Sequence, residues 1–230
     1  GGPYYLQLAI DANIWNSVNN WNLHGRDGSY NRLTILGDGS DINLDALESD
    51  FDTQGNSLYL EGDFGLVDLT NTVATIDNIR INALDSFTGS ESDDSVIVKD
   101  NNLSFSGGAG DDRLTIDFEN YSPYYWDDNY TATLSVKGNI DGGAGSDTLA
   151  FSNANGYESV RIIDLSKAVF TNIETIETGS VSLVVSSSQY SNITFSGSGA
   201  VYTEVNGVLQ GTDSDDSFSG DGTGQFKPGA

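Results

Sequence analysis

The chain has 230 residues, of which 34 are acidic and 9 are basic, so its formal net charge is −25. This charge argues against nucleic acid and anionic membrane as partners, because both are bound through basic surface, and no apolar run approaches membrane-spanning length. The absence of cysteine excludes disulfide bonds, zinc–thiolate sites and thiol catalysis.

One helix is predicted, over residues 10–21, where Ile10, Ile14, Val18 and Trp21 recur at helical spacing. We expect residues 1–36 to cap one end of the fold, with apolar bulk from nearby aromatic residues, namely Tyr4, Tyr5, Trp15, Trp21 and Tyr30. An acidic run follows, and it either holds a cation or forms a solvated loop. Its members are Asp38, Asp41, Asp45, Asp50 and Asp52.

The rest of the chain is typical of short β-strands, because apolar and β-branched residues alternate with polar ones between Gly, Asn, Asp and Ser. The predicted strands are 57–60, 65–69, 74–76, 78–81, 133–136, 160–163 and 182–185. Segments 77–81 and 171–177 echo each other with an Asn-Ile step, as the coils of a solenoid would. We expect one elongated domain over 1–219 and a tail over 220–230 that leads into a following module.

Two stretches of nine residues, 107–115 and 142–150, fit the pattern Gly-Gly-x-Gly-x-Asp-x-apolar-x at every position. The glycines permit positive φ and bring carbonyls inward, the aspartate supplies a carboxylate, and the apolar residue begins a strand. Such hard oxygen ligands suit calcium. Degenerate copies occur at 89–97 and 211–219, and a looser echo occurs at 37–42.

The spacing of the repeats adds context to the motif. The copy at 89–97 starts 18 residues before the one at 107–115, a register that stacks Asp94 over Asp112. The intervening residues 98–106 keep Phe105 at the eighth position but lack the glycine and aspartate, so they predict a strand and a turn without metal. The alternative for all these turns is that Gly and Asp form tight turns and bind no ion.

These motifs resemble the repeats-in-toxin (RTX) family of secreted bacterial proteins. The resemblance implies an all-β fold, a right-handed parallel β-roll or β-solenoid, in which each calcium lies between loops one coil apart. Carbonyls and the sixth-position aspartates of both loops would hold the ion. The metal-binding residues implied here are Asp94, Gly107, Gly108, Gly110, Asp112, Gly142, Gly143, Gly145, Asp147, Asp213 and Asp216.

Calcium would also offset the charge of −25, which opposes compaction. Binding free energy at a site that the unfolded chain lacks becomes folding free energy. We therefore expect several calcium ions, and a chain that is loose without them and folded with them.

An aromatic segment separates the two full repeats. Gly107 and Gly142 are 35 residues apart, nearly two coils, and no repeat survives between them. We expect an inserted loop that projects between two calcium loops and recognises a ligand. Its candidate ligand-binding residues are Tyr121, Tyr124, Tyr125, Trp126, Asp127 and Asp128. The alternative is that these aromatic residues close a satellite core under a long loop.

Catalysis is not expected. His24 is the only histidine, so the chain has no zinc-binding H-E-x-x-H helix. We expect this lone histidine, between Leu23 and Gly25, to be structural and to form no credible Ser-His-Asp set. A polysaccharide-active enzyme on a parallel β-helix is a further alternative, but its polyanionic substrates would meet a chain of charge −25.

By resemblance, we expect an extracellular, calcium-dependent ligand-binding module of a large adhesin on a bacterial cell surface, as a monomeric part of a longer chain. Its ligand would be a peptide or a glycan on another cell. A peptide C-terminal carboxylate or a sugar diol would complete an open calcium shell beside Tyr124, Tyr125 and Trp126. The alternative is a structural spacer or surface-layer module, in which calcium only rigidifies the chain.

Overall fold

The computed structural model describes residues 6–18, 31–45, 47, 57–72, 79–118, 132–152, 160–179, 181–190, 193–205, 208–210 and 225–227. These residues form β-strands with two short helices, which confirms the all-β class. In this part of the chain, the structure has no helix with the length and apolar character needed to cross a membrane.

The elements in chain order are β1 (Leu6–Asp11), α1 (Ala12–Asn16), β2 (Asn31–Asp38), β3 (Ile42–Asn43), β4 (Ser57–Asp68), β5 (Ile79–Thr88), β6 (Ser95–Val98), β7 (Asn102–Ala109), β8 (Arg113–Asp117), β9 (Ala132–Ser135), β10 (Lys137–Ala144), β11 (Thr148–Ser152), β12 (Val160–Asp164), β13 (Ala168–Thr171), β14 (Thr175–Gly179), β15 (Ser182–Ser186), α2 (Ser187–Tyr190), β16 (Thr194–Gly197), β17 (Val201–Val205), β18 (Val208–Gln210) and β19 (Gln225–Lys227).

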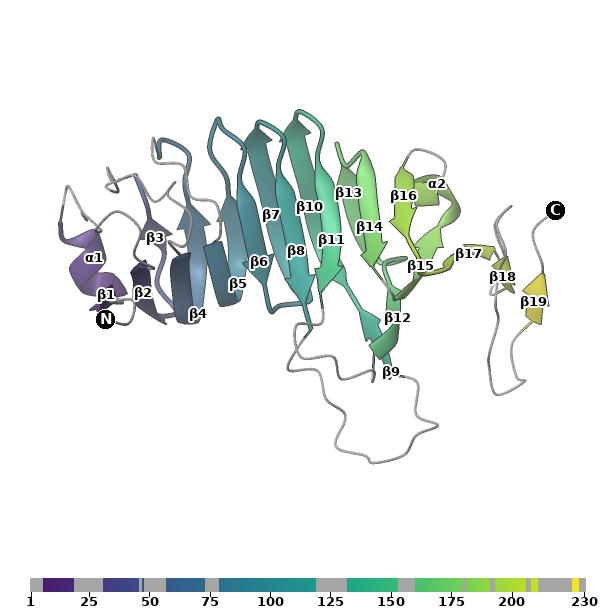
Figure 1. The fold of residues 1–230 in the computed structure, drawn as a ribbon, viewed down its shortest axis with the longest axis horizontal. Coiled ribbons are helices and arrows are strands. Elements are labelled where there is room, and N and C mark those ends of the chain that lie inside the picture. The colour runs from purple at the N-terminus through teal and green to yellow at the C-terminus, as the bar shows by residue number, and fades with distance from the viewer. Residues whose placement is uncertain are drawn as a thin grey trace, which may run out of the picture.

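Neighbouring strands pair in parallel and follow one another along the long axis of the molecule (Figure 1). The larger sheet runs in the order β1-β2-β4-β5-β6-β8-β11-β14-β16, and a second branch, β7-β10-β13, joins it at β5. The smaller sheet pairs β9, β12, β15 and β17 in parallel and continues into β18 and β19. Among the described strands, β17 and β18 form the one antiparallel pair.

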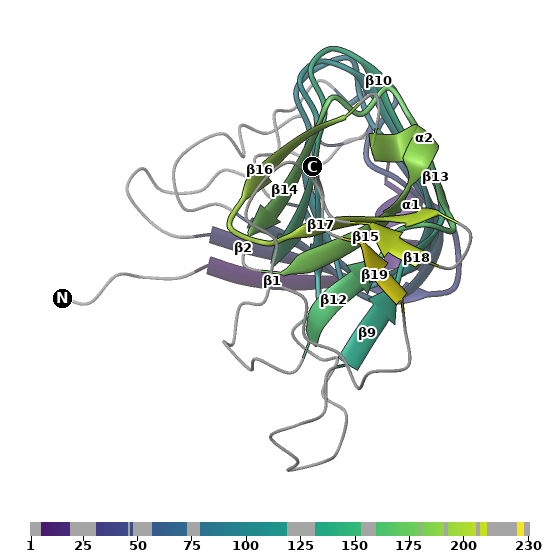
Figure 2. The same ribbon diagram turned by 90° about the vertical axis from the view of Figure 1, so that its right-hand side faces the viewer.

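Apolar side chains form buried columns in register from strand to strand. Figure 2 looks along the long axis of Figure 1, so that the paired strands lie behind one another. One column is Leu33, Leu58, Ile79, Val96, Leu114, Leu149 and Ile176. The second is Ile42, Val67, Phe87, Phe105 and Ile140. The third is Leu134, Ile163, Leu183 and Val201. The first column contains the eighth position of three repeats, which explains why that position is apolar.

The predicted 18-residue register is confirmed. Ser95 of β6 pairs with Arg113 of β8, and Phe87 of β5 pairs with Phe105 of β7. The rings of Phe87 and Phe105 stack with their centroids 5.2 Å apart. The expected strand in 98–106 is present as β7, with Phe105 buried.

The interpretation of the 35-residue spacing as nearly two coils is wrong. Arg113 pairs directly with Thr148, and Gly108 pairs with Gly143, so the 35 residues complete a single winding of the chain. The additional length lies between β8 and β10, where β9 begins the smaller sheet.

The predicted helix over 10–21 is also wrong in extent, because α1 contains only Ala12–Asn16 and residues 19–21 lie outside the described part. Ile10 belongs to β1, while Ile14 is 51% exposed. The buried residues of α1 are Ala12 and Trp15, and Trp15 Nε1 donates a hydrogen bond of 2.8 Å to the carbonyl oxygen of Asn43. The helical spacing of the isoleucines therefore did not mark the face that contacts the core.

Most predicted strands occur, with one change of boundary. The predicted strands 57–60 and 65–69 belong to one continuous strand, β4, which bends at Gly62 with φ of 101°. The predictions at 78–81, 133–136, 160–163 and 182–185 fall on β5, β9, β12 and β15. The prediction at 74–76 lies outside the described residues.

Candidate metal centre

Three of the predicted calcium turns stack directly on one another. They join β5 to β6, β7 to β8, and β10 to β11, at one edge of the parallel ladders. The metal-binding residues that the sequence predicts in these turns, and that the structure brings together, are Asp94, Gly107, Gly108, Gly110, Asp112, Gly142, Gly143, Gly145 and Asp147. Asp213 and Asp216 lie outside the described residues, as do all six candidate ligand-binding residues from Tyr121 to Asp128.

The first glycine of each turn is required by close approach of the next turn. A Cβ on Gly107 would stand 2.2 Å from the carbonyl oxygen of Gly142, and one on Gly89 would stand 1.7 Å from that of Gly107. The second glycine is required by its backbone angle, since Gly108 and Gly143 have φ of 110° and 104°. The motif therefore places carbonyl oxygens between consecutive turns.

Gly107→Ala tests this packing. We expect it to lower the free energy of unfolding by about 1–3 kcal/mol, the usual cost of overpacking, because the contact is with backbone that pairs on both sides. Chemical denaturation measures the change. Ser104→Ala, at an exposed position of the same strand, is the control and is expected to be neutral. Equal stabilities for the two variants would show that the turns are not packed as described.

The sixth-position aspartates form a buried column. Asp94, Asp112 and Asp147 are 5%, 2% and 1% exposed. Asp112 Oδ1 accepts a hydrogen bond of 2.8 Å from the Asp94 amide, and Asp147 Oδ1 accepts one of 2.8 Å from the Asp112 amide. The carboxylates of Asp112 and Asp147 thus each anchor the backbone of the preceding turn.

The second carboxylate oxygens of this column are the unusual feature. Asp94 Oδ2 accepts a hydrogen bond of 2.7 Å from the Ser90 amide. Asp112 Oδ2 and Asp147 Oδ2 are buried and accept no hydrogen bond from any described residue. Asp112 Oδ2 and the carbonyl oxygen of Gly142 both lie within 2.3 Å of the point where a Gly107 Cβ would stand. Asp112 Oδ2 is therefore buried near a carbonyl oxygen and accepts no hydrogen bond from the described residues, which is costly unless a cation is bound nearby.

Electrostatics add to this cost. Burial raises the pKa of Asp112, and the nearby carboxylates of Asp94, Asp147 and Asp93 act in the same direction, so that together they bring it from its ordinary value of 3.8 to about 7. Burial also raises the pKa values of Asp94 and Asp147. A divalent cation would relieve both the desolvation and the repulsion.

The oxygen atoms present suit calcium in kind. Calcium takes about six to eight oxygen ligands, including carboxylates and backbone carbonyls. Among the described residues, no three side chains of His, Cys, Asp or Glu are grouped closely enough to hold a metal by themselves. An ion in this stack would therefore depend on backbone carbonyls, with a few carboxylates such as Asp112 Oδ2 and Asp147 Oδ2.

A second column of polar side chains, which the sequence did not predict, lies on the exposed side of the same turns. Asp93 Oδ1 accepts a hydrogen bond of 2.8 Å from the Asp111 amide, and Asp111 Oδ1 accepts one of 2.9 Å from the Ser146 amide. The signal in the sequence is the Asp-Asp pair at the fifth and sixth positions of two repeats. These carboxylates orient the turns from outside.

The acidic run near the N-terminus is engaged with backbone and side-chain donors. Asp41 Oδ1 accepts a hydrogen bond of 2.8 Å from the Leu66 amide, and Asp45 Oδ1 accepts one of 3.1 Å from the Asn71 amide. Asp38 bonds to Ser40 and Asn13, and these bonds hold the pKa of Asp38 below its usual value. Asp50 and Asp52 lie outside the described residues.

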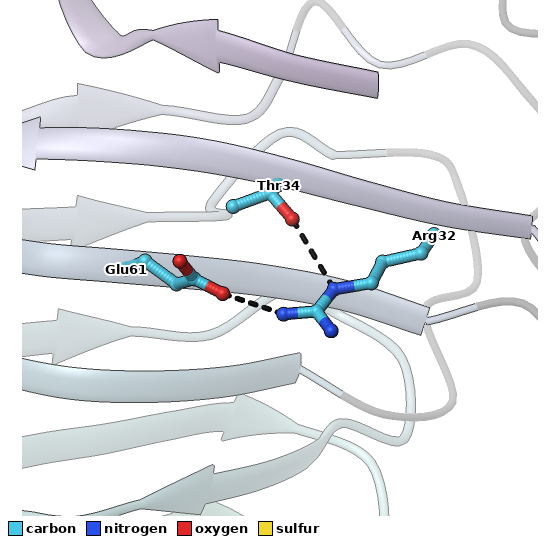
Figure 3. Close-up of polar contacts among 3 residues, drawn as sticks. All are labelled: Arg32, Thr34 and Glu61. Atoms are coloured by element: carbon cyan, nitrogen blue, oxygen red, sulfur yellow. Dashed lines mark hydrogen bonds and ion pairs between the residues drawn. The ribbon is translucent and has the colours of Figure 1, made fainter. Parts of the chain in front are cut away.

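A polyanionic substrate would be bound through basic side chains, and two of the arginines are paired with glutamates. Figure 3 shows Arg32 of β2 reaching Glu61 on the adjacent strand β4 and Thr34 on its own strand, and its guanidinium also lies 3.7 Å from the centroid of the Tyr59 ring. Arg113 makes two hydrogen bonds to Glu177. A polyanion would have to displace these pairs.

Comparison of the chain with protein-family profiles, curated proteins and solved structures finds no match.

Proposed function

We propose that the protein is an extracellular, calcium-dependent ligand-binding module of an RTX-type bacterial adhesin, folded as a right-handed parallel β-roll. The observation that carries the calcium part is the pair of buried oxygens, Asp112 Oδ2 and Asp147 Oδ2, that accept no hydrogen bond from the described residues. The parallel pairing at an offset of 18 residues supports the β-roll.

The ligand part rests on the resemblance and on the aromatic segment between β8 and β9. The carboxylates of Asp112 and Asp147 are 2% and 1% exposed, so ions held there would be closed to an external ligand. A ligand would be met by residues 121–128, through Tyr124, Tyr125 and Trp126 and a calcium ion whose shell is completed by a peptide carboxylate or a sugar diol. A glycan and peptide array, probed with calcium and with chelator, identifies which ligand is bound.

Replacing Tyr125 and Trp126 together by alanine tests the recognition segment. We expect the double variant to lose the array signal, because a few aromatic residues supply most of the binding energy of an interface. Its melting temperature should stay close to that of the wild type, since a recognition role for Tyr125 and Trp126 requires that they contribute to the interface and not to the core. The array and a thermal melt in calcium measure the two quantities.

Tyr59→Ala, which truncates an aromatic residue on β4 outside the segment, is the matched control and should keep the array signal. A loss of roughly 3–5 kcal/mol of stability in the double variant would instead place these residues in a core. Retained binding would contradict the recognition role directly.

A structural spacer is the second candidate, and the burial of the aspartate column favours it. Closed ions between stacked turns would rigidify the module and would contact nothing outside it. The two functions differ in one result: a spacer needs calcium for folding but shows no calcium-dependent ligand on any array.

A further inference from the structure

The turn between β13 and β14 continues the stack of calcium turns although it contains no repeat motif. Residues 171–174 lie directly against the turn 142–147. The amide of Asp147 donates a hydrogen bond of 2.8 Å to Glu174 Oε2, and the amides of Glu174 and Thr175 donate hydrogen bonds of 3.2 and 3.1 Å to the carbonyl oxygen of Asp147. The two turns are thus joined by three hydrogen bonds.

Asn172 occupies the place that a first glycine has in the other turns. Its carbonyl oxygen lies 2.0 Å from the point where a Gly142 Cβ would stand, as the Gly142 carbonyl oxygen does above Gly107 at 2.2 Å. Its φ of 51° makes it the one non-glycine residue with positive φ in the described chain. Its side chain is fixed by a hydrogen bond of 2.9 Å to Asp141 Oδ1.

Glu174 occupies the place of the sixth-position aspartate. Its carboxylate accepts the hydrogen bond from the Asp147 amide, just as Asp147 accepts one from Asp112 and Asp112 accepts one from Asp94. The longer glutamate side chain compensates for a turn that is shorter than the repeat. The carboxylate ladder therefore has a fourth member that the nonapeptide pattern does not predict.

An unsatisfied buried oxygen faces this last turn. Asp147 is 1% exposed, and its Oδ2 accepts no hydrogen bond from the described residues. It lies 2.6 Å from the same Gly142 Cβ point that the Asn172 carbonyl oxygen approaches. The carboxylates of Glu174, Asp111 and Asp141 are close enough to repel it.

We propose that the turn 171–174 closes the stack with a further divalent-cation site, in which Asp147 Oδ2, the carbonyl oxygen of Asn172 and the carboxylate of Glu174 are ligands. These are all hard oxygen atoms, which favours calcium. The site rests on the proposed calcium-dependent function and extends it to residues outside the repeat motif.

Counting bound calcium by native mass spectrometry tests the site, with isothermal titration for the affinities. Glu174→Gln, which preserves shape and removes the charge, is expected to bind one calcium fewer than the wild type and to keep the others. Glu177→Gln is the matched control on β14, because Glu177 lies within the strand and pairs with Arg113 of β8, and it should keep the full number. Asn172→Gly, which keeps the carbonyl and tolerates positive φ, should also keep it.

Glu174→Gln with the full number of ions and unchanged affinities would overturn the terminal site alone. A wild-type protein that binds no calcium would overturn the proposed function, and the terminal site with it. If Glu174→Gln does not fold, Glu174→Asp serves instead. It keeps the charge on a shorter side chain, so one ion should bind more weakly than in the wild type, and unchanged affinity for every ion would contradict the proposal.

Discussion

Excess chelator is expected to unfold the protein or to leave it molten, and added calcium is expected to restore it. The chain carries a formal charge of −25 and buries three aspartates in one column, so the metal-free state combines long-range repulsion with local desolvation. Binding of several dications converts this cost into folding free energy. Circular dichroism and thermal melting in chelator and in calcium measure the change.

Two controls separate specific binding from simple screening of charge. Sodium chloride at matched ionic strength should restore little structure, because buried carboxylates are screened far less than exposed ones. Magnesium should be a poor substitute, since it is smaller and gives up its water ligands reluctantly. An unchanged strand signal and melting temperature in excess chelator would refute a structural role for calcium.

The parts of the fold that the sequence predicted are those in which side chains repeat at a fixed period. The apolar eighth position of the repeats marks Val96, Leu114 and Leu149, which stack in one buried column. The spacing of 18 residues predicted that Asp94 lies over Asp112, and the Asp94 amide donates a hydrogen bond to the Asp112 carboxylate in the neighbouring turn. When the period is fixed, the position of one residue in a turn gives the position of the equivalent residue in the next turn.

The parts that the sequence did not predict depend on pairing across irregular intervals. Asp112 and Asp147 are 35 residues apart and Asp147 and Glu174 are 27 apart, and both intervals form single windings. Only the pairing of β8 with β11, and of β11 with β14, reveals this. Glu174 and Asn172 were missed for the same reason, since they act through position and not through the glycine pattern.

The helix α1 was predicted with the wrong extent and the wrong apolar face. Spacing of Ile10 and Ile14 predicted the wrong apolar face, because the chain around α1 must also continue β1 into the sheet. Ile10 pairs with Ile35 as part of a strand, and Trp15 takes the core position against β3. Tertiary pairing overrides helical propensity in a segment this short.

Asp112→Asn is expected to be more stable than the wild type without metal and less stable than the wild type with calcium. In chelator at pH 7, the variant should keep more folded structure than the wild type, with the folding equilibrium displaced by on the order of 2–4 kcal/mol, because a neutral amide replaces a buried carboxylate whose pKa is raised to about 7. In calcium the variant should be the less stable of the two, since it loses an anionic ligand. Circular dichroism of both proteins in chelator and thermal melts of both proteins in calcium measure the two differences.

The stability of the metal-free wild type should fall as the pH rises, because the Asp112 carboxyl must lose its proton. A carboxyl whose folded-state pKa is raised holds its proton better in the native than in the unfolded chain, so its contribution is present near pH 4 and is lost as the pH rises to about 7. The wild type should therefore lose stability between these values more steeply than Asp112→Asn. Asp85→Asn, which removes one charge from an exposed position of β5, should follow the wild-type slope. Parallel pH profiles for the wild type and Asp112→Asn, with no reversal in calcium, would mean that the Asp112 carboxylate neither destabilises the metal-free fold nor binds the ion.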